Sequence, residues 1–182
     1  MKYYYFHGYK SSPMAEKAKA MREVLGSDNV IVPDFNLSAE EISDLFDKLC
    51  DEISSSKEEV CIVGSSLGGL FALNIASRVK CNTILLNPAL IPMVIIPKVT
   101  DVIDVKSVVL VQKLSLYAYE YYEAEKTLIW VTHDPLINHD DLTKPYFYKG
   151  CKEYIKFDED IASGHEFTGF KDVFAKYIKN NS

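Results

Sequence analysis

The sequence has few cysteines, no long hydrophobic run and no excess of positive charge. Its four cysteines are widely spaced and form no C-x-x-C pair, which excludes the usual spacings of zinc sites and redox motifs. The most apolar stretch, Ala89 to Val99, is interrupted by Pro92 and Pro97 and is far shorter than the roughly 20 residues of a transmembrane helix. A net charge of −6 argues against a nucleic-acid partner, which would require a basic face.

The N-terminus also lacks a secretion signal. A single lysine, Lys2, precedes a short aromatic run that His7 and Gly8 interrupt, so no signal-peptide core is present. With the cysteines interpreted as reduced thiols, this predicts a cytoplasmic protein. The composition, with 48% hydrophobic and 25% charged residues, is that of a globular protein. Residues 1–182 are expected to form one domain, which at this length buries roughly 70% of its unfolded surface and needs neither disulfides nor metal.

Short apolar runs alternate with longer amphipathic segments, a pattern typical of βαβ units around a mostly parallel sheet. Helices are expected over Pro13–Leu25 with Ser12 as N-cap, from a capping box at Ser38 onward, and over Thr168–Lys179. The sequence therefore predicts an α/β fold with helices on both faces of the sheet. About six strands are expected, at Lys2–Phe6, Asn29–Val32, Glu59–Val63, Thr83–Leu86, Thr127–Thr132 and Glu153–Phe157.

A long helical insert, Ile91 to Lys126, replaces the short connection that the repeating pattern predicts. Its second half places Leu110, Leu114, Tyr117 and Tyr121 at helical spacing. Such a stripe is typical of an ordinary packed helix, but a cap over an active site would use the same residue types to shape an acyl pocket. The two interpretations are compatible. Leu114 and Tyr117 are therefore candidate pocket residues, and a small, partly tyrosine-lined pocket is expected.

The segment Gly64-Ser65-Ser66-Leu67-Gly68 lies between a predicted strand and a predicted helix. This is the context of a nucleophile elbow, a sharp turn that crowds the positions two before and two after the nucleophile so that only very small residues fit. Counting from Ser66 gives Gly64 and Gly68, whereas counting from Ser65 gives a valine and a leucine. Ser66 is therefore the candidate nucleophile.

A glycine-rich turn from strand to helix can instead bind phosphate at the helix N-terminus. This segment lacks the Gly-Lys-Ser/Thr of a P-loop, and its glycines do not match the G-x-G-x-x-G spacing of a dinucleotide site. A serine nucleophile, by contrast, needs a base and an orienting acid. The choice between the two interpretations therefore depends on the histidines and aspartates that follow.

Two later loops supply an acid and a base in the hydrolase order Ser, Asp, His. Asp134 follows a predicted strand, and His165 lies in a glycine-bearing loop just before the final helix. The other histidines, His7, His133 and His139, lie upstream of these positions or beside the acid loop, so only His165 follows both other candidates. An aspartate before a proline is also ordinary turn chemistry, which leaves four alternative acids: Asp140, Asp141, Asp158 and Asp160.

Two backbone amides are candidates for an oxyanion hole. The Leu67 N–H directly follows the nucleophile, and the loop after the first strand, His7-Gly8-Tyr9, offers the Tyr9 N–H as the second donor. His7 and Tyr9 are also candidate pocket residues. No metal ion or cofactor is implied by this chemistry.

Together these motifs resemble those of the small bacterial esterases of the YqiA/YcfP type, within the α/β-hydrolase superfamily. The opening Phe6-His7-Gly8-Tyr9-Lys10-Ser11-Ser12-Pro13 is similar to the family's His-Gly-aromatic-x-Ser-Ser-Pro start. The elbow, Asp134 and the segment Ser163-Gly164-His165-Glu166-Phe167 complete the match, which extends over nearly the whole chain. The resemblance implies a compact sheet without the superfamily's first strands, and esterase or thioesterase activity on short acyl groups.

The sequence thus predicts a serine hydrolase that acts on small-molecule esters or thioesters through an acyl-enzyme intermediate. Its catalytic residues would be Ser66, His165 and Asp134. Two alternatives use the same fold: a non-catalytic protein that binds a small ligand, and an acyltransferase or peptidase with the same triad. No membrane partner is expected, and the sequence indicates neither the natural substrate nor the oligomeric state.

Overall fold

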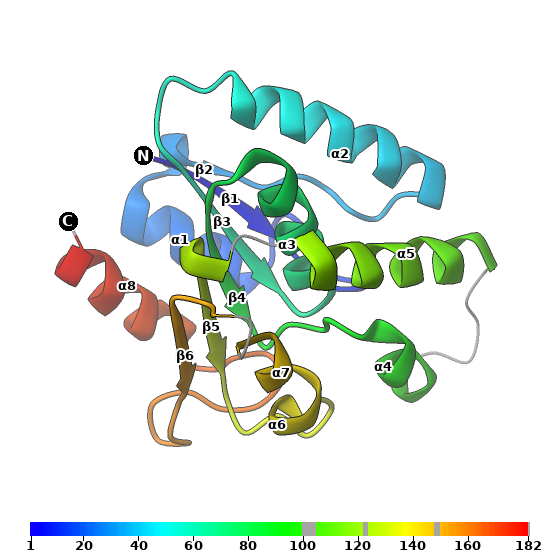
Figure 1. Cartoon of the computed structure of the whole chain (residues 1–182). Helices are drawn as coiled ribbons and strands as arrows, with labels where there is room; N and C mark the ends of the chain where they lie inside the picture. Colours follow the sequence, from blue (N-terminus) through cyan, green and yellow to red (C-terminus); the bar gives the residue numbers. More distant parts are fainter. Residues whose placement is uncertain (100–104, 122–123, 148–149, 182) are drawn as a thin grey trace.

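The protein is built around one six-stranded sheet, in which every pair of neighbouring strands is parallel (Figure 1). This computed structural model describes residues 1–99, 105–121, 124–147 and 150–181. The strand order β2-β1-β3-β4-β5-β6 confirms the prediction of a mostly parallel sheet of six strands. The strands are β1 (Lys2–Phe6), β2 (Val30–Ile31), β3 (Val60–Ser65), β4 (Asn82–Leu86), β5 (Thr127–Val131) and β6 (Glu153–Lys156).

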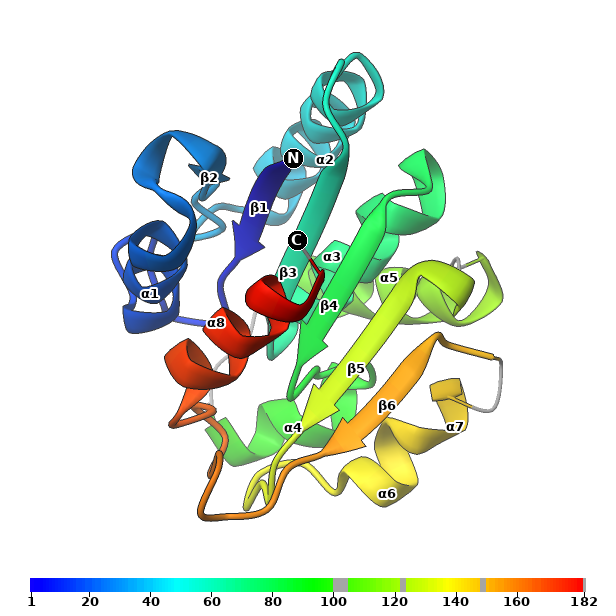
Figure 2. The ribbon, with the colours of Figure 1, turned by 90° about the vertical axis from the view of Figure 1, so that its left-hand side faces the viewer.

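Helices cover both faces of the sheet, as predicted (Figure 2). One face packs against α1 (Glu16–Leu25) and α8 (Phe170–Asn181), and the other against α2 (Ala39–Ser54), α3 (Leu67–Val79) and α5 (Val105–Tyr121). The strands β3 and β5 are buried at every residue because apolar side chains point to both faces and each face is covered. Two clusters of core side chains therefore form, one on each side of the sheet.

The starts of α1 and α2 follow different local chemistry. Ser38 caps α2 as predicted: its hydroxyl accepts from the Glu41 N–H, and the Glu41 carboxylate accepts from the Ser38 N–H. The predicted cap at Ser12 is wrong, because its hydroxyl accepts from the N–H of Met14 and closes a turn. As a result α1 begins at Glu16, three residues after the predicted start.

Two short helices, α4 (Pro92–Val99) and α6 (His139–Leu142), lie at the carboxyl ends of the strands, and α7 (Lys144–Phe147) lies alongside β6 (Figure 2). Ligand sites of parallel α/β sheets form at the carboxyl ends of the strands. Two short 3-10 turns complete the described elements, Ser27–Asn29 and Ala124–Lys126. Among the described residues, no helix combines the length and the apolar character needed to cross a membrane.

The predicted helical insert at Ile91–Lys126 contains α4 and α5, which have different roles in the fold. The second half of α5 packs against α3, where the Asn74 side chain donates a hydrogen bond to the Leu114 carbonyl at 3.0 Å. Leu114 and Ala118 are buried in the core. The start of α5 and all of α4 instead lie toward the carboxyl edge of the sheet (Figures 1 and 2).

Candidate active site

Ser66 occupies the sharp turn between β3 and α3. Its backbone has φ +54° and ψ −121°, a strained conformation for a residue with a side chain. The Ser66 N–H donates to the Leu86 carbonyl at 3.0 Å, and the Ser66 carbonyl accepts from the N–H groups of Gly69 and Ala89, both at 2.9 Å. These hydrogen bonds stabilise the strained turn and hold the Ser66 side chain at the carboxyl edge of the sheet.

The glycines on either side of Ser66 are required by close backbone contacts. A Cβ atom on Gly64 would lie 2.4 Å from the Gly68 carbonyl oxygen. One on Gly68 would lie 2.1 Å from the carbonyl oxygen of Phe6 in β1. Both distances are shorter than real Cβ contacts. The crowding that selected Ser66 over Ser65 in the sequence is therefore present around Ser66.

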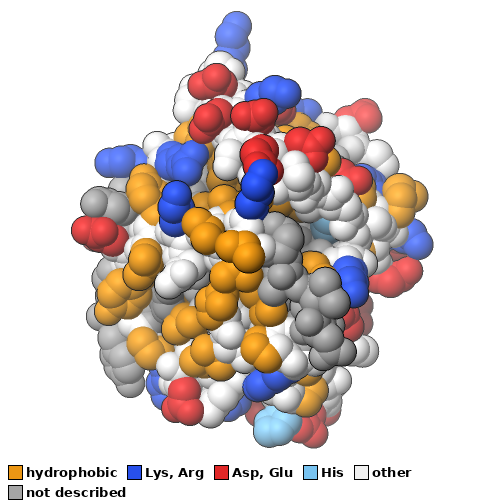
Figure 3. Space-filling model, turned by 90° about the vertical axis from the view of Figure 1, so that its right-hand side faces the viewer, with side chains coloured by type: hydrophobic (Ala, Val, Ile, Leu, Met, Phe, Trp, Pro, Cys, Tyr) orange, Lys and Arg blue, Asp and Glu red, His pale blue; other side chains and the backbone are white. Residues whose placement is uncertain are grey.

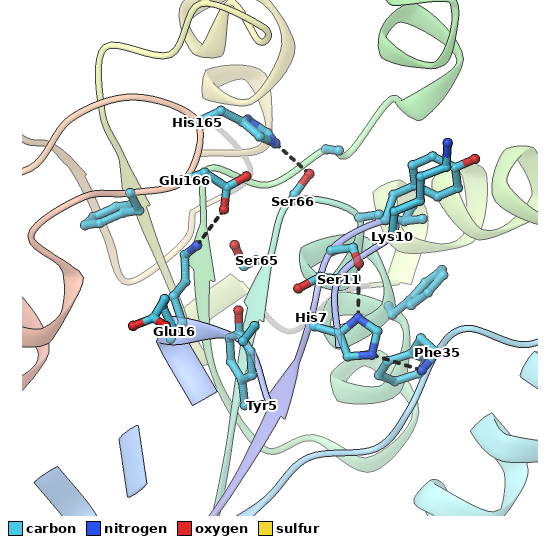
Figure 4. Close-up of a pocket in the computed structure, with 18 of the residues that line it drawn as sticks. Tyr5, His7, Lys10, Ser11, Glu16, Phe35, Ser65, Ser66, His165 and Glu166 are labelled. Atoms are coloured by element: carbon cyan, nitrogen blue, oxygen red, sulfur yellow. Dashed lines mark hydrogen bonds and ion pairs between the residues drawn. The ribbon is translucent and has the colours of Figure 1, made fainter. Parts of the chain in front are cut away.

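The three polar side chains proposed from the sequence lie in one hydrogen-bonded chain, although they come from three different loops. The Ser66 hydroxyl donates to His165 Nε2 at 2.9 Å (Figure 4). His165 Nδ1 donates to Asp134 Oδ2 at 2.7 Å. These roles follow from the carboxylate, which only accepts, so that the proton of the neutral imidazole lies on Nδ1. The arrangement has the donors and acceptors that proton transfer from a serine hydroxyl requires.

Asp134 is held by four N–H donors. The backbone N–H groups of Leu136 and Ile137 donate to Oδ1 at 2.8 and 3.2 Å, while His165 and His139 donate to Oδ2. Burial of Asp134 by itself raises the pKa of the carboxyl group, but the hydrogen bonds outweigh that effect and hold the pKa well below its usual value. The carboxylate therefore stays ionised at neutral pH.

This lowered pKa predicts how stability depends on pH. A carboxyl group whose pKa is lower in the folded than in the unfolded protein stabilises the fold above its unfolded pKa, which is about 4. That contribution is lost as the pH falls further. The difference in free energy of unfolding between the natural protein and Asp134→Asn, measured by urea unfolding, should narrow as the pH falls below about 4. A difference that stays constant down to pH about 3 would contradict this.

The contact between His139 and Asp134 is not predicted by the sequence, in which His139 is a candidate only for the base. His139 Nε2 donates to Asp134 Oδ2 at 3.1 Å. Its other nitrogen, Nδ1, accepts from the Thr143 hydroxyl at 2.7 Å, and both residues are buried. Thr143 and Asp134 thus hold the His139 ring in one orientation, with Nε2 toward the carboxylate.

Asn87, directly after β4, is a second residue that the sequence analysis missed. Its side chain is fully buried, and its amide nitrogen donates to the Thr132 hydroxyl at 3.0 Å and to the carbonyls of Gly164 and His165 at 2.9 and 3.2 Å. Its amide oxygen accepts from the Thr132 N–H at 2.8 Å. Asn87 therefore joins the ends of β4 and β5 to the loop that carries His165. Its place just after a predicted strand was the available signal.

Replacing Asn87 with aspartate tests this link without changing the size of the side chain. The new oxygen would face the oxygens of the Gly164 and His165 carbonyls and would donate to neither. The Gly164 carbonyl would keep the Thr132 hydroxyl and the Phe167 N–H as donors, whereas the His165 carbonyl would lose its Asn87 donor. We expect the free energy of unfolding to fall by about 2–4 kcal/mol, and kcat/KM for an ester to fall with it, as measured by urea unfolding and an ester assay. Asn181→Asp is the control, because the Asn181 amide also donates to a carbonyl but is exposed. Equal stability of the two variants would contradict the prediction.

The loop after β1 approaches Ser66 from the opposite side to His165. His7 is buried, with Nε2 accepting from the Phe35 N–H at 3.1 Å and Nδ1 donating to the Gly8 carbonyl at 3.0 Å. Among the described residues, the N–H groups of Leu67 and Tyr9 donate to no other protein group. Both amides are therefore available to a ligand.

A cavity of about 1200 Å³ opens beside Ser66 and His165, larger than the small pocket that we expected. His7 and Tyr9 line it, and so do apolar side chains of α4 and the start of α5. Figure 3 shows hydrophobic side chains gathered on the side of the molecule where these helices lie. The apolar part of the wall includes Pro92, Ile95, Ile96, Leu110 and Val111.

The prediction that Leu114 and Tyr117 line the pocket is wrong. Leu114 is buried in the core, where α5 packs against α3. Tyr117 has the Arg78 guanidinium 5.6 Å from the centre of its ring. Of the stripe residues whose side chains the structure describes, only Leu110 lines the cavity, because the stripe faces the helix layer and the cavity meets only the first turns of α5. Tyr121 ends α5, and its side chain lies outside the described residues.

Metal-binding clusters and cysteines with a lowered pKa would be two other sources of catalytic chemistry in the described part of the chain. Its histidines, cysteines and carboxylates form no group of three that could hold a metal ion. Burial raises the pKa of the Cys151 thiol to about 11 and that of Cys81 to about 12. The Cys61 thiol has its pKa raised further by burial, so it does not supply a thiolate.

Comparison with solved structures identifies proteins of similar fold. The α/β-hydrolase domain-containing protein 10 from mouse has a TM-score of 0.69 and 13% identity, covering 98% of this chain and 88% of its own. Est1E from Butyrivibrio proteoclasticus has a TM-score of 0.67 and 16% identity, with 98% and 85% covered. The Pyrococcus furiosus esterase Pf2001 has a TM-score of 0.66 and 18% identity, with 99% and 77% covered. At such identities the likeness establishes the α/β-hydrolase fold.

The resemblance to the small YqiA/YcfP-type esterases is also confirmed, because a family model extends over almost the whole sequence. That family is described as "Uncharacterised protein family (UPF0227)", and its model matches residues 2–180. The chain therefore belongs to the UPF0227 family and has the α/β-hydrolase fold.

Proposed function

We propose that this protein is a serine hydrolase that cleaves carboxylic esters or thioesters through an acyl-enzyme intermediate. The observation that supports it best is the hydrogen-bonded chain from Ser66 through His165 to Asp134, at the edge of a large cavity. A protein that only binds a small ligand does not require a serine hydroxyl that donates to a histidine, which in turn donates to a carboxylate. The solved esterases with the same fold are consistent with the proposal.

In the first step, Ser66 Oγ attacks the carbonyl carbon while His165 Nε2 takes the hydroxyl proton. The negative charge that develops on the carbonyl oxygen is stabilised by the N–H groups of Leu67 and Tyr9, each typically worth about 10²- to 10³-fold in rate. The tetrahedral intermediate then expels the alcohol or thiol, which receives the proton from His165. Water, deprotonated by His165, attacks the acyl-enzyme and releases the acid and free Ser66.

Asp134 orients His165 and stabilises the imidazolium that forms in each step. Its low pKa keeps the carboxylate charged while His165 carries the extra proton. His139 donates to the same carboxylate oxygen and restricts its position. The roles proposed for His165 and Asp134 therefore depend on a buried hydrogen-bond network.

The acyl length that the enzyme accepts depends on the cavity. The family resemblance implies short acyl groups, whereas ligand pockets commonly measure about 300–1,000 Å³, and this cavity measures about 1200 Å³. The α4 and α5 wall is apolar and suits an acyl chain. A series of 4-nitrophenyl esters and acyl thioesters of increasing length, assayed for kcat/KM, would decide the preference.

A fluorophosphonate probe tests the proposal directly, because it labels only an activated serine. We expect it to label Ser66, as identified by mass spectrometry of the digested protein, and to abolish ester hydrolysis. Absence of labelling in the folded protein, together with no turnover of any ester or thioester, would favour a ligand-binding protein. Acyl transfer would be recognised by a new ester product when an alcohol is added.

A further inference from the structure

The catalytic cavity contains a buried lysine that the proposed mechanism does not use. Lys17, on α1, lines the same cavity as Ser66, and only 9% of it is exposed. It lies on the side of the sheet covered by α1 and α8, away from the apolar wall of α4 and α5. Buried lysines are rare in proteins unless they have a partner, because removing an ammonium group from water is costly.

The single protein partner of Lys17 among the described residues is a weak one. Lys17 Nζ lies 3.4 Å from Glu166 Oε2, the pair marked by the dashed line from Glu166 in Figure 4. An ammonium group has three N–H donors, so two remain without a protein acceptor in the described residues. The Glu166 side chain is 86% exposed, whereas that of Lys17 is 10% exposed. Water therefore competes for the carboxylate much more than for the ammonium group.

The other lysines at this end of the cavity differ from Lys17. Lys19 pairs with Glu16 at 3.2 Å, and Lys171 pairs with Glu23. All four of these side chains are about half exposed or more. Exposed pairs are screened by water and salt, whereas a charge removed from water acts strongly on its neighbours. At this end of the cavity the charge of Lys17 is therefore the least screened, although the lysines and glutamates there balance in number.

Figure 4 shows how Glu166, the partner of Lys17, lies relative to the nucleophile. Glu166 follows His165 directly, and Ser65, next to Ser66, lies between Ser66 and Tyr5. Tyr5 lines the cavity here and is itself 2% exposed. A substrate whose carbonyl lies at Ser66 can thus extend in two directions, along the apolar wall or toward Lys17.

We infer that Lys17 forms a subsite for an anionic group, a carboxylate or phosphate, on the ester or thioester that is bound at Ser66. The anion would accept hydrogen bonds from the two N–H groups of Lys17 that have no protein acceptor in the described residues. The Glu166 side chain would move into water at little cost because it is already exposed. Burial lowers the pKa of Lys17, partly offset by Glu166, and a bound anion favours the charged form in the same way. This inference depends on the proposed function for its catalytic role, and the experiment separates the two.

The test compares matched esters in two variants. One pair, 4-nitrophenyl hydrogen glutarate and its methyl ester, carries the charge on the acyl side, and the other, 3-carboxyphenyl butyrate and its methyl ester, on the alcohol side. In the natural protein we expect higher kcat/KM for the charged member of one pair, which identifies the side. In Lys17→Met this preference should fall by about 10- to 100-fold, the worth of a hydrogen bond to a charged group. Lys19→Met, with the same charge change on an exposed side chain of the same helix, should keep it.

Two results would overturn the inference: no preference for either charged ester in the natural protein, or an equal loss for charged and neutral esters in Lys17→Met. The second result would assign Lys17 to positioning the His165 loop through Glu166. Calorimetric titration with glutarate provides a readout without turnover, in which Lys17→Met should bind at least about 10-fold more weakly than the natural protein. If no ester is cleaved, the proposed function fails, but glutarate binding still decides the subsite. Urea unfolding confirms that both variants fold.

Discussion

Replacing Ser66 with alanine is expected to lower kcat for 4-nitrophenyl butyrate by about 10⁴- to 10⁶-fold, because triad residues act as a unit. The variant has no oxygen to attack the carbonyl, while the N–H groups of Leu67 and Tyr9 remain and allow a small residual rate. The Ser66 hydroxyl donates only to His165 in the described residues, so its loss leaves the rest of the turn intact. Steady-state assays, with circular dichroism to confirm folding, measure the effect.

Ser65→Ala is the matched control, since it removes a hydroxyl from the adjacent residue. Ser65 is the last residue of β3 and is 5% exposed. Its side chain points to the α1 and α8 side of the sheet, because side chains alternate along a strand. We expect kcat within about tenfold of the natural protein, as for a substitution outside the reacting groups. Inactivity of Ser65→Ala with an active Ser66→Ala would show that the steric choice of nucleophile is wrong.

Replacing Asp134 with asparagine is expected to lower kcat by about 10³- to 10⁴-fold, because His165 would no longer be held in the tautomer that accepts the Ser66 proton on Nε2. The Asp134 carboxylate accepts from two backbone N–H groups on one oxygen and from two imidazoles on the other. An asparagine has one oxygen and one NH₂ group. Whichever way it is turned, its NH₂ group faces two N–H donors, so either the backbone turn or the orientation of both histidines is lost.

The control for this variant is Asp140→Asn, also near the end of β5. Asp140 is one of the alternative acids from the sequence, but it is exposed and accepts from Lys156 at 2.9 Å. Surface ion pairs contribute about 0–1 kcal/mol. We therefore expect its kcat to change less than about twofold, because the exposed Asp140 carboxylate contacts Lys156 and not the triad. If Asp140→Asn were the inactive variant and Asp134→Asn active, the acid would have to be reassigned.

Much of the fold follows from local patterns that the tertiary structure did not override. Strands that are buried on both faces appear in the sequence as short apolar runs. The helices predicted between these runs indicate that neighbouring strands are parallel. The elbow was recognisable because a strained turn with two close backbone contacts admits glycine and little else. The order of Asp134 and His165 along the chain then predicted which side chains meet, because carboxyl ends of parallel strands share one edge.

The sequence by itself therefore determined the fold class, the elbow and the three polar residues that lie together around it. The tertiary structure decided which face of α5 meets the cavity, how Asn87 holds the His165 loop and His139 holds Asp134, and that Lys17 is buried in the wall of the same cavity. The physical reason is that periodicity reports which face of an element is apolar, but not which element covers that face. Hydrogen bonds between distant loops, and the burial of a charge, depend on atoms that only the packed chain brings together.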